Sequence, residues 1–125
     1  MSISDLIGKP WALPCDPPAS FDCWELAVAV RDRLGLVTPK YEVAAENRTA
    51  AHRASLGKPD PTIWKRLDKP RDGCLVGFGG RFVRHCGVFY RGKIIHAHGN
   101  LGHTVCQDVS ICTMTMGKPT YWETV

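Results

Sequence analysis

The chain has 125 residues, a formal net charge of +4 at pH 7 and an apolar content of 44%. This length supports one domain with one hydrophobic core, so residues 1–125 are expected to form a single domain, and the apolar content excludes a disordered chain. The basic residues form no run and do not interleave with aromatic residues, so no nucleic-acid partner is predicted. No apolar run is long enough to span a membrane.

The first eleven residues, MSISDLIGKPW, contain neither the basic segment nor the apolar segment that signal peptides have. We therefore expect the chain to be made in the cytoplasm. Thiols stay reduced there, so we expect the six cysteines to be free and most of them to be packing residues.

The N-terminal part of the chain has helical patterns. Residues 2–7 can form one or two helical turns with Ser2 as the N-cap, and the prolines of residues 12–20 predict an irregular loop. From Asp22 to Leu34, apolar residues recur at helical spacing, and Gly35 follows as a C-cap, so a helix is predicted there.

Two further segments precede residue 70. After a connector over residues 36–41, residues 44–56 contain good helix formers and predict a second helix, which is polar on most faces. Asp60 and Pro61 are an N-cap followed by a proline, so they predict a short helical turn that continues through Trp64 and Leu67.

The C-terminal part has the texture of a β-sheet. The predicted strands are Cys74–Phe78, Val83–Tyr90, Lys93–His98, Thr104–Val109 and a final short strand that involves Met114 or Tyr121–Thr124. Gly79-Gly80 is expected to be a turn, and Arg91-Gly92 a tight hairpin turn. Helices followed by a meander of antiparallel strands indicate the α+β class.

Cys23 stands at the predicted start of the helix that follows the proline-rich loop. A thiol at a helix N-terminus is near unpaired N–H groups and the positive end of the helix dipole, and both favour the reactive thiolate. Taken alone, Cys23 is better explained as a small buried core residue, which is the usual fate of a free cysteine.

Two histidines downstream favour a nucleophile instead. If Arg91-Gly92 forms a two-residue turn, residue 87 lies opposite His96 and His85 lies roughly opposite His98, so His85 and His96 are close across the ladder. One histidine can accept the thiol proton while the other holds its ring in one tautomer. The sequence therefore predicts a Cys23, His85, His96 triad, in which the backbone N–H of Cys23 donates to the oxyanion.

Five blocks in register resemble the NlpC-type cysteine peptidases, which are bacterial and phage enzymes that cut peptidoglycan stem peptides. The blocks are Gly8–Trp11, Phe21–Leu26, Pro70–Phe78, His85–Tyr90 and Ile94–Ala97. The resemblance covers nearly the whole chain. It implies a minimal papain-like fold, in which N-terminal helices pack on a C-terminal antiparallel sheet of about four to five strands.

The same resemblance implies roles for single residues. Cys23 matches the nucleophile, His85 the general base and His96 the orienting residue. Trp11 falls where the family has a tyrosine near the oxyanion, and the residues around the nucleophile, Asp22, Trp24 and Glu25, are expected to line the substrate cleft with it. The implied reaction is hydrolysis of an amide such as the γ-D-glutamyl to diamino acid bond, and it needs no cofactor or metal.

Trp24 and the Gly79-Gly80-Arg81 segment look most like the tail-assembly branch of the family, from long-tailed phages. This implies phage tail-tip proteins as partners besides the peptidoglycan peptide, and a location in the virion tail, the periplasm or the cell wall.

Three positions depart from the family pattern. Trp11 has no hydroxyl, although its indole N–H can donate; Glu25 replaces a glycine; and Cys74 replaces an aspartate. A carboxylate at Glu25 would oppose thiolate formation or crowd the cleft. These departures concern substrate range and turnover more than the fold.

Three other readings remain open. The side chains of His85, Cys86, His96, His98, His103 and Cys106 could be zinc ligands, although the sequence has no CxxC pair and no HExxH motif. The chain could also be a non-catalytic tail or cell-wall binding module of the same fold. The same triad could instead perform another acyl-cysteine reaction, as a thioesterase or transamidase.

Overall fold

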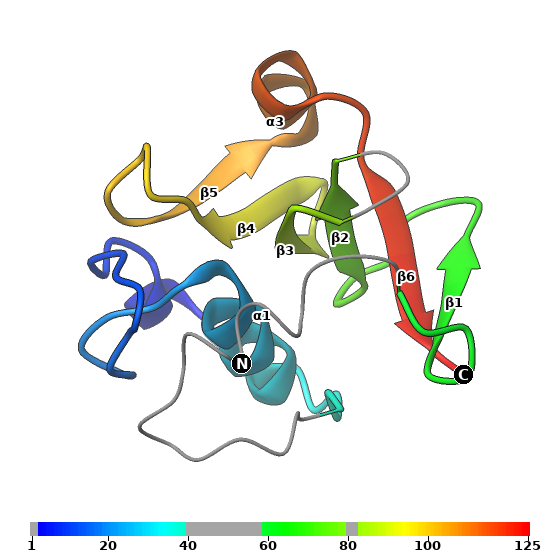
Figure 1. Ribbon diagram of the computed structural model, residues 1–125, viewed down its shortest axis with the longest axis horizontal. Helices are drawn as coiled ribbons and strands as arrows, with labels where there is room; N and C mark the ends of the chain where they lie inside the picture. The colour runs from blue at the N-terminus through cyan, green and yellow to red at the C-terminus, as the bar shows by residue number, and fades with distance from the viewer. Residues whose placement is uncertain (1–2, 40–58, 80–82) are drawn as a thin grey trace.

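The computed structural model describes residues 3–39, 59–79 and 83–125. Within these ranges the chain forms a six-stranded antiparallel sheet with one helix packed on each face, α1 (Cys23–Arg33) and α3 (Val109–Met116) (Figure 1). The α+β class predicted from the sequence is confirmed. The predicted helix over residues 44–56, the N-cap Ser2 and the second glycine of the Gly79-Gly80 turn lie outside the described residues.

The strands are β1 (Trp64–Leu67), β2 (Leu75–Phe78), β3 (His85–Tyr90), β4 (Lys93–Ala97), β5 (Thr104–Asp108) and β6 (Thr120–Thr124). Their order across the sheet is β1-β6-β2-β3-β4-β5. The prediction of about four to five strands is wrong, because the sheet has six.

The additional strand is β1, which was expected to be helical. Asp60 does begin a turn, and its backbone carbonyl accepts hydrogen bonds from the N–H groups of Ile63 and Trp64. The chain then extends, because Trp64 to Leu67 pair antiparallel with β6. Strand pairing with a segment almost sixty residues away overrides the local helix signal of the Asp-Pro pair.

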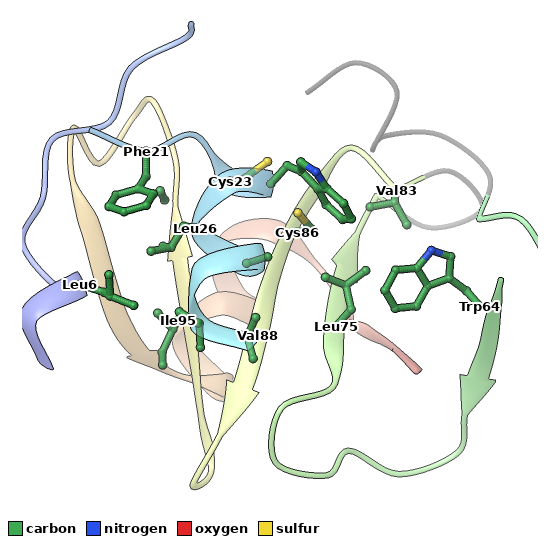
Figure 2. Packing of buried hydrophobic residues seen from close by; sticks show 14 residues of the cluster. Leu6, Phe21, Cys23, Leu26, Trp64, Leu75, Val83, Cys86, Val88 and Ile95 are labelled. Carbon is green, nitrogen blue, oxygen red and sulfur yellow. The ribbon is translucent and has the colours of Figure 1, made fainter. Parts of the chain in front are cut away.

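Helix α1 lies where the sequence predicts it. Asp22 is its N-cap, and the Asp22 carboxylate accepts a hydrogen bond of 2.7 Å from the Glu25 N–H. After the C-cap Leu34, Gly35 has a φ of +77°, which glycine adopts without strain. The buried face of α1 packs on β3 and β4, and Figure 2 shows Leu26 above Val88 and Ile95.

Helix α3 was not predicted. Residues Val109–Met116 were expected to contain the end of one strand and, as one of two alternatives for a final short strand, Met114. Instead they form a helix against β4 and β5, where Cys112 joins a second apolar cluster with Val76, Phe78 and Ile94. The β-branched residues of this segment, which include two threonines, disfavour a helix locally. Burial of Cys112 against the sheet therefore decides the conformation of residues 109–116.

The N-terminal segment forms one turn, the 3-10 helix η1 (Ser4–Leu6), which is the shorter of the two lengths predicted for it. Residues 12–20 form the expected irregular loop. Among the described residues, no helix combines the length and the apolar character that crossing a bilayer requires.

A buried ion pair links α1 to β6, a strand that lies beyond β2 from the strands on which α1 packs. Arg31, with 1% of its surface exposed, donates to Glu123 of β6 at 2.8 Å and to the Gly73 carbonyl at 2.6 Å. It also donates to Thr38 and lies over the Trp64 ring. All of these partners come from other segments, so Arg31 ties the helix that carries Cys23 to the chain around it.

Candidate active site

Cys23 is the first residue of α1, and its side chain is only 2% exposed. Because Asp22 is the N-cap, the thiol lies beside the first-turn N–H groups, as the sequence predicts. Figure 2 shows the Cys23 sulfur at the beginning of the helix, above the core cluster. This position combines a favourable field for a thiolate with shielding from bulk water.

The two histidines come from the β3–β4 hairpin. Its turn is the expected one: Tyr90 pairs with Lys93, and Arg91 and Gly92 have φ values of +50° and +80°. Gly87 therefore lies opposite His96, as predicted. The Nε2 atom of His85 is 2.9 Å from the Nδ1 atom of His96, and the two rings meet edge to face.

Gly87 allows the histidines to approach this closely. A Cβ atom at this position would lie 2.8 Å from the Ile95 carbonyl oxygen and 3.0 Å from the His96 Cβ. The glycine is buried between the strands, so a side chain there would push β3 away from β4. The spacing of the His85–His96 pair thus depends on a residue with no side chain.

One pocket of about 210 Å³ brings together Cys23 and His85. Its walls are Trp11, Cys23, Arg84, His85, Ala97, His98 and Gly99. His96 lies behind His85 and outside this lining, where it touches the His85 ring. A thiol and an imidazole in one pocket are a pair that can act as nucleophile and base, and a second imidazole behind the first can orient it.

Trp11 lines this pocket beside Cys23. Its backbone N–H donates to the Gly102 carbonyl at 3.0 Å, and it forms an isolated bridge with Phe21, two residues before the nucleophile. The indole packs against Gly99, where a Cβ would lie 3.3 Å from the ring. The loop that follows Trp11 thus returns to the helix start, and this places Trp11 near Cys23 as the resemblance implies.

His96, which lies behind His85, is held neutral near pH 7. Burial, followed by the nearby charges of His85 and His98, lowers the pKa of His96 to about 4, although its hydrogen bond with Gln107 acts in the opposite direction. Burial also lowers the pKa of His98. A neutral His96 can accept a hydrogen bond from His85, which an imidazolium could not do.

Cys86 lies on β3 close to Cys23 (Figure 2). A hydrogen bond with Cys23, and then burial, raise the pKa of Cys86 well above its usual value. Cys86 therefore stays protonated, and its S–H is a donor toward the Cys23 sulfur. It is a packing residue that also belongs to the nucleophile's environment.

Asp22, Trp24 and Glu25, which were expected in the cleft, are outside the lining of the Cys23 pocket. Asp22 is fully buried as the N-cap of α1. Trp24 is 4% exposed and belongs to the core cluster. Glu25 instead lines a separate pocket with Pro17 and Phe21. Both residues follow Cys23 around the first helical turn, so their side chains leave in other directions.

Two residues near the histidines were missed in the sequence. Gln107 of β5 has its Oε1 2.8 Å from His96 Nε2, and Cys112 of α3 has its sulfur 3.7 Å from the same nitrogen. The strand prediction for residues 104–109 could have placed Gln107 beside His96. The sequence contained no signal for Cys112, because α3 was not expected.

A second pocket, of about 330 Å³, adjoins this cluster. Its lining residues are His96, His98, Asn100, Leu101, Gln107, Thr115 and Met116. His98 belongs to both pockets, and its ring is 4.9 Å from that of His85, centroid to centroid. The two hollows therefore meet at His98.

Within the described ranges, no group of three or more His, Cys, Asp or Glu side chains is arranged to hold a metal ion. Of the residues considered as zinc ligands, His103 and Cys106 are exposed, whereas Cys86 is buried beneath Cys23.

Comparison of the chain with protein-family models, with curated proteins and with solved structures found no match.

Proposed function

We propose that this protein is a cysteine hydrolase that cleaves amide bonds in peptidoglycan stem peptides, in the manner of NlpC-type peptidases. One observation carries the proposal: Cys23 begins a helix and lines the same pocket as His85, whose ring is 2.9 Å from His96. A cysteine that only packs in the core does not require a position at a helix N-terminus, a pair of hydrogen-bonded histidines or a shared pocket.

The reaction follows from these positions. His85 takes the proton of Cys23, and the thiolate attacks the carbonyl carbon and forms a C–S bond. The Cys23 N–H stabilises the oxyanion, with the Trp11 indole on the same pocket wall. His85 then protonates the leaving amine as the C–N bond breaks. Water, deprotonated by His85, breaks the C–S bond and releases the acid.

The substrate class rests on the resemblance to NlpC-type peptidases and on charge. Stem peptides carry carboxylates, and the exposed Arg84 lines the Cys23 pocket in a chain of net charge +4. We extend the proposal to the γ-D-glutamyl to diamino acid bond and to a tail-associated role, because the blocks around Cys23 and Gly79 resemble the tail-assembly branch.

The test is incubation of the purified protein with defined muropeptides, followed by identification of the products by mass. We expect two fragments whose summed mass exceeds that of the substrate by one water, and no product from Cys23→Ala. A non-catalytic binding module would retain muropeptides without cleaving them. A transamidase would join the acyl fragment to an added amine instead of water, and either result would overturn the proposal.

A further inference from the structure

Gln107 lies on the side of His96 that faces away from His85. In the β4–β5 ladder, His96 pairs with Val105 and Ile94 pairs with Gln107, so Gln107 is the diagonal neighbour of His96 on the same face of the sheet. Its Oε1 is 2.8 Å from His96 Nε2. His96 thus has a hydrogen-bonding partner at each ring nitrogen, His85 at Nδ1 and Gln107 at Nε2.

The chemistry of the amide gives this chain of hydrogen bonds a direction. An amide oxygen accepts and cannot donate, so the neutral His96 carries its proton on Nε2 and leaves Nδ1 with a lone pair. His85 must then donate its Nε2–H to that lone pair. The remaining nitrogen of His85, Nδ1, is left unprotonated, and it is the atom free to accept the Cys23 proton.

Cys112 supports the orientation of the amide. Its sulfur lies 3.7 Å from Gln107 Oε1 and 3.7 Å from His96 Nε2, and the thiol is fully buried. The S–H donates to the amide oxygen, which therefore accepts from both His96 and Cys112. Helix α3 thus contributes to the histidine cluster from the face of the sheet opposite α1.

We propose that Gln107 is a positioning residue, which selects the Nε2–H tautomer of His96 and thereby directs the unprotonated nitrogen of His85 to Cys23. This inference rests on the proposed function, because it assigns His85 as the base for Cys23. Gln107 acts through His96 and touches neither the nucleophile nor the pocket that Cys23 lines.

Three variants test whether Gln107 acts as the hydrogen-bond acceptor for His96. Gln107→Leu removes the acceptor at similar size, Gln107→Glu keeps an acceptor oxygen, and Gln107→Asn keeps the amide but shortens its reach. Cys106→Ser is the matched control, since Cys106 neighbours Gln107 on β5 and points to the other face.

The first readout is the ¹⁵N chemical shifts of the histidine rings, which distinguish a protonated from a bare nitrogen. In the wild type we expect His96 to be protonated at Nε2 only. Gln107→Leu and Gln107→Asn should populate the Nδ1–H form, whereas Gln107→Glu and Cys106→Ser should not. A wild-type His96 protonated at Nδ1 overturns the inference without any variant.

The second readout is the rate of alkylation of Cys23 by iodoacetamide at neutral pH, located by peptide mapping. Loss of the partner that orients a metal-ligating histidine typically costs about ten- to a hundredfold, and by analogy we expect a slowing of that order in Gln107→Leu with rescue in Gln107→Glu. An unchanged rate in folded Gln107→Leu contradicts the inference.

Neither readout uses a substrate, so the two proposals fail separately. If muropeptides are not cleaved but the tautomer shifts as expected, only the proposed function is wrong. If muropeptides are cleaved and the wild-type tautomer or the Gln107→Leu response is not as expected, only the role of Gln107 is wrong.

Discussion

The Nε2 atom of His85 and the Nδ1 atom of His96 lie 2.9 Å apart, across a hairpin in which Gly87 pairs with His96. This hydrogen bond joins a residue of the Cys23 pocket to a buried, neutral histidine behind it. The following predictions start from this pair and from the residues that hold Cys23 in front of it.

Cys23 should be the first of the six thiols to be alkylated near neutral pH. Burial raises the pKa of Cys15 to about 12. Burial also raises the pKa values of Cys74, Cys106 and Cys112. The pKa of Cys86 is raised mainly by its hydrogen bond with Cys23. Brief iodoacetamide treatment and peptide mapping would measure this. In His85→Ala the Cys23 rate should fall; preferential labelling of the exposed Cys106 would argue against the assignment.

The second prediction concerns Cys86, whose S–H is a donor toward the Cys23 sulfur. Cys86→Ala removes the donor and should slow alkylation of Cys23 roughly fivefold, the equivalent of one ordinary hydrogen bond. Cys86→Ser keeps a donor and should retain most of the rate. Stopped-flow measurements on both variants make the comparison, and equal rates in Cys86→Ala and wild type would show that the contact does not matter.

Trp11 is expected to donate its indole N–H on the oxyanion side of the pocket. Trp11→Tyr keeps a donor and should keep most of the hydrolytic activity, whereas Trp11→Phe should lose about two to three orders of magnitude in kcat. The measurement is muropeptide hydrolysis by both variants. If Trp11→Phe is as active as Trp11→Tyr, the ring only shapes the pocket against Gly99.

The buried Arg31–Glu123 pair should contribute strongly to stability. Removing one partner leaves an uncompensated buried charge, so Glu123→Ala should lower the free energy of unfolding by about 3–5 kcal/mol. The matched control is the exposed Arg33–Asp5 pair at 2.7 Å, where Asp5→Ala should leave the free energy of unfolding nearly unchanged because solvent screens the pair. Urea denaturation of both variants tests this, and similar losses would refute the difference.

Stability should fall as the pH drops from about 6.5 to about 4. His96 has its pKa lowered from 6.5 to about 4 when folded, so in this window the unfolded chain binds a proton that the folded one does not. Above pH 6.5 His96 is neutral in both states and the free energy of unfolding has its full value. Between pH 6.5 and pH 4 the free energy of unfolding falls by about 3 kcal/mol. Below about 4 no further loss comes from this residue.

The His96 contribution is isolated by comparing unfolding curves over this pH range with those of His96→Asn, which should lack most of the dependence. His98, whose pKa is also lowered, adds a smaller part in the same direction. Identical pH dependence in His96→Asn and wild type would disprove the assignment.

The sequence alone determined the features that depend on neighbouring residues. Asp22, helical spacing and Gly35 delimit α1, so Cys23 could be placed at its start. The Arg91-Gly92 turn sets the β3–β4 register, because a two-residue hairpin leaves no freedom in which residues pair, and this brought His85 and His96 together.

The tertiary structure decided what depends on contacts between distant segments. Pairing with β6 makes residues 64–67 a strand, and packing of Cys112 on the sheet makes residues 109–116 a helix, both against local preference. Gln107 reaches His96 only because β5 lies beside β4. Glu25 lies outside the Cys23 pocket because its side chain projects from α1 in a different direction from that of Cys23. These outcomes depend on burial and pairing energies summed over the whole fold, which no local pattern contains.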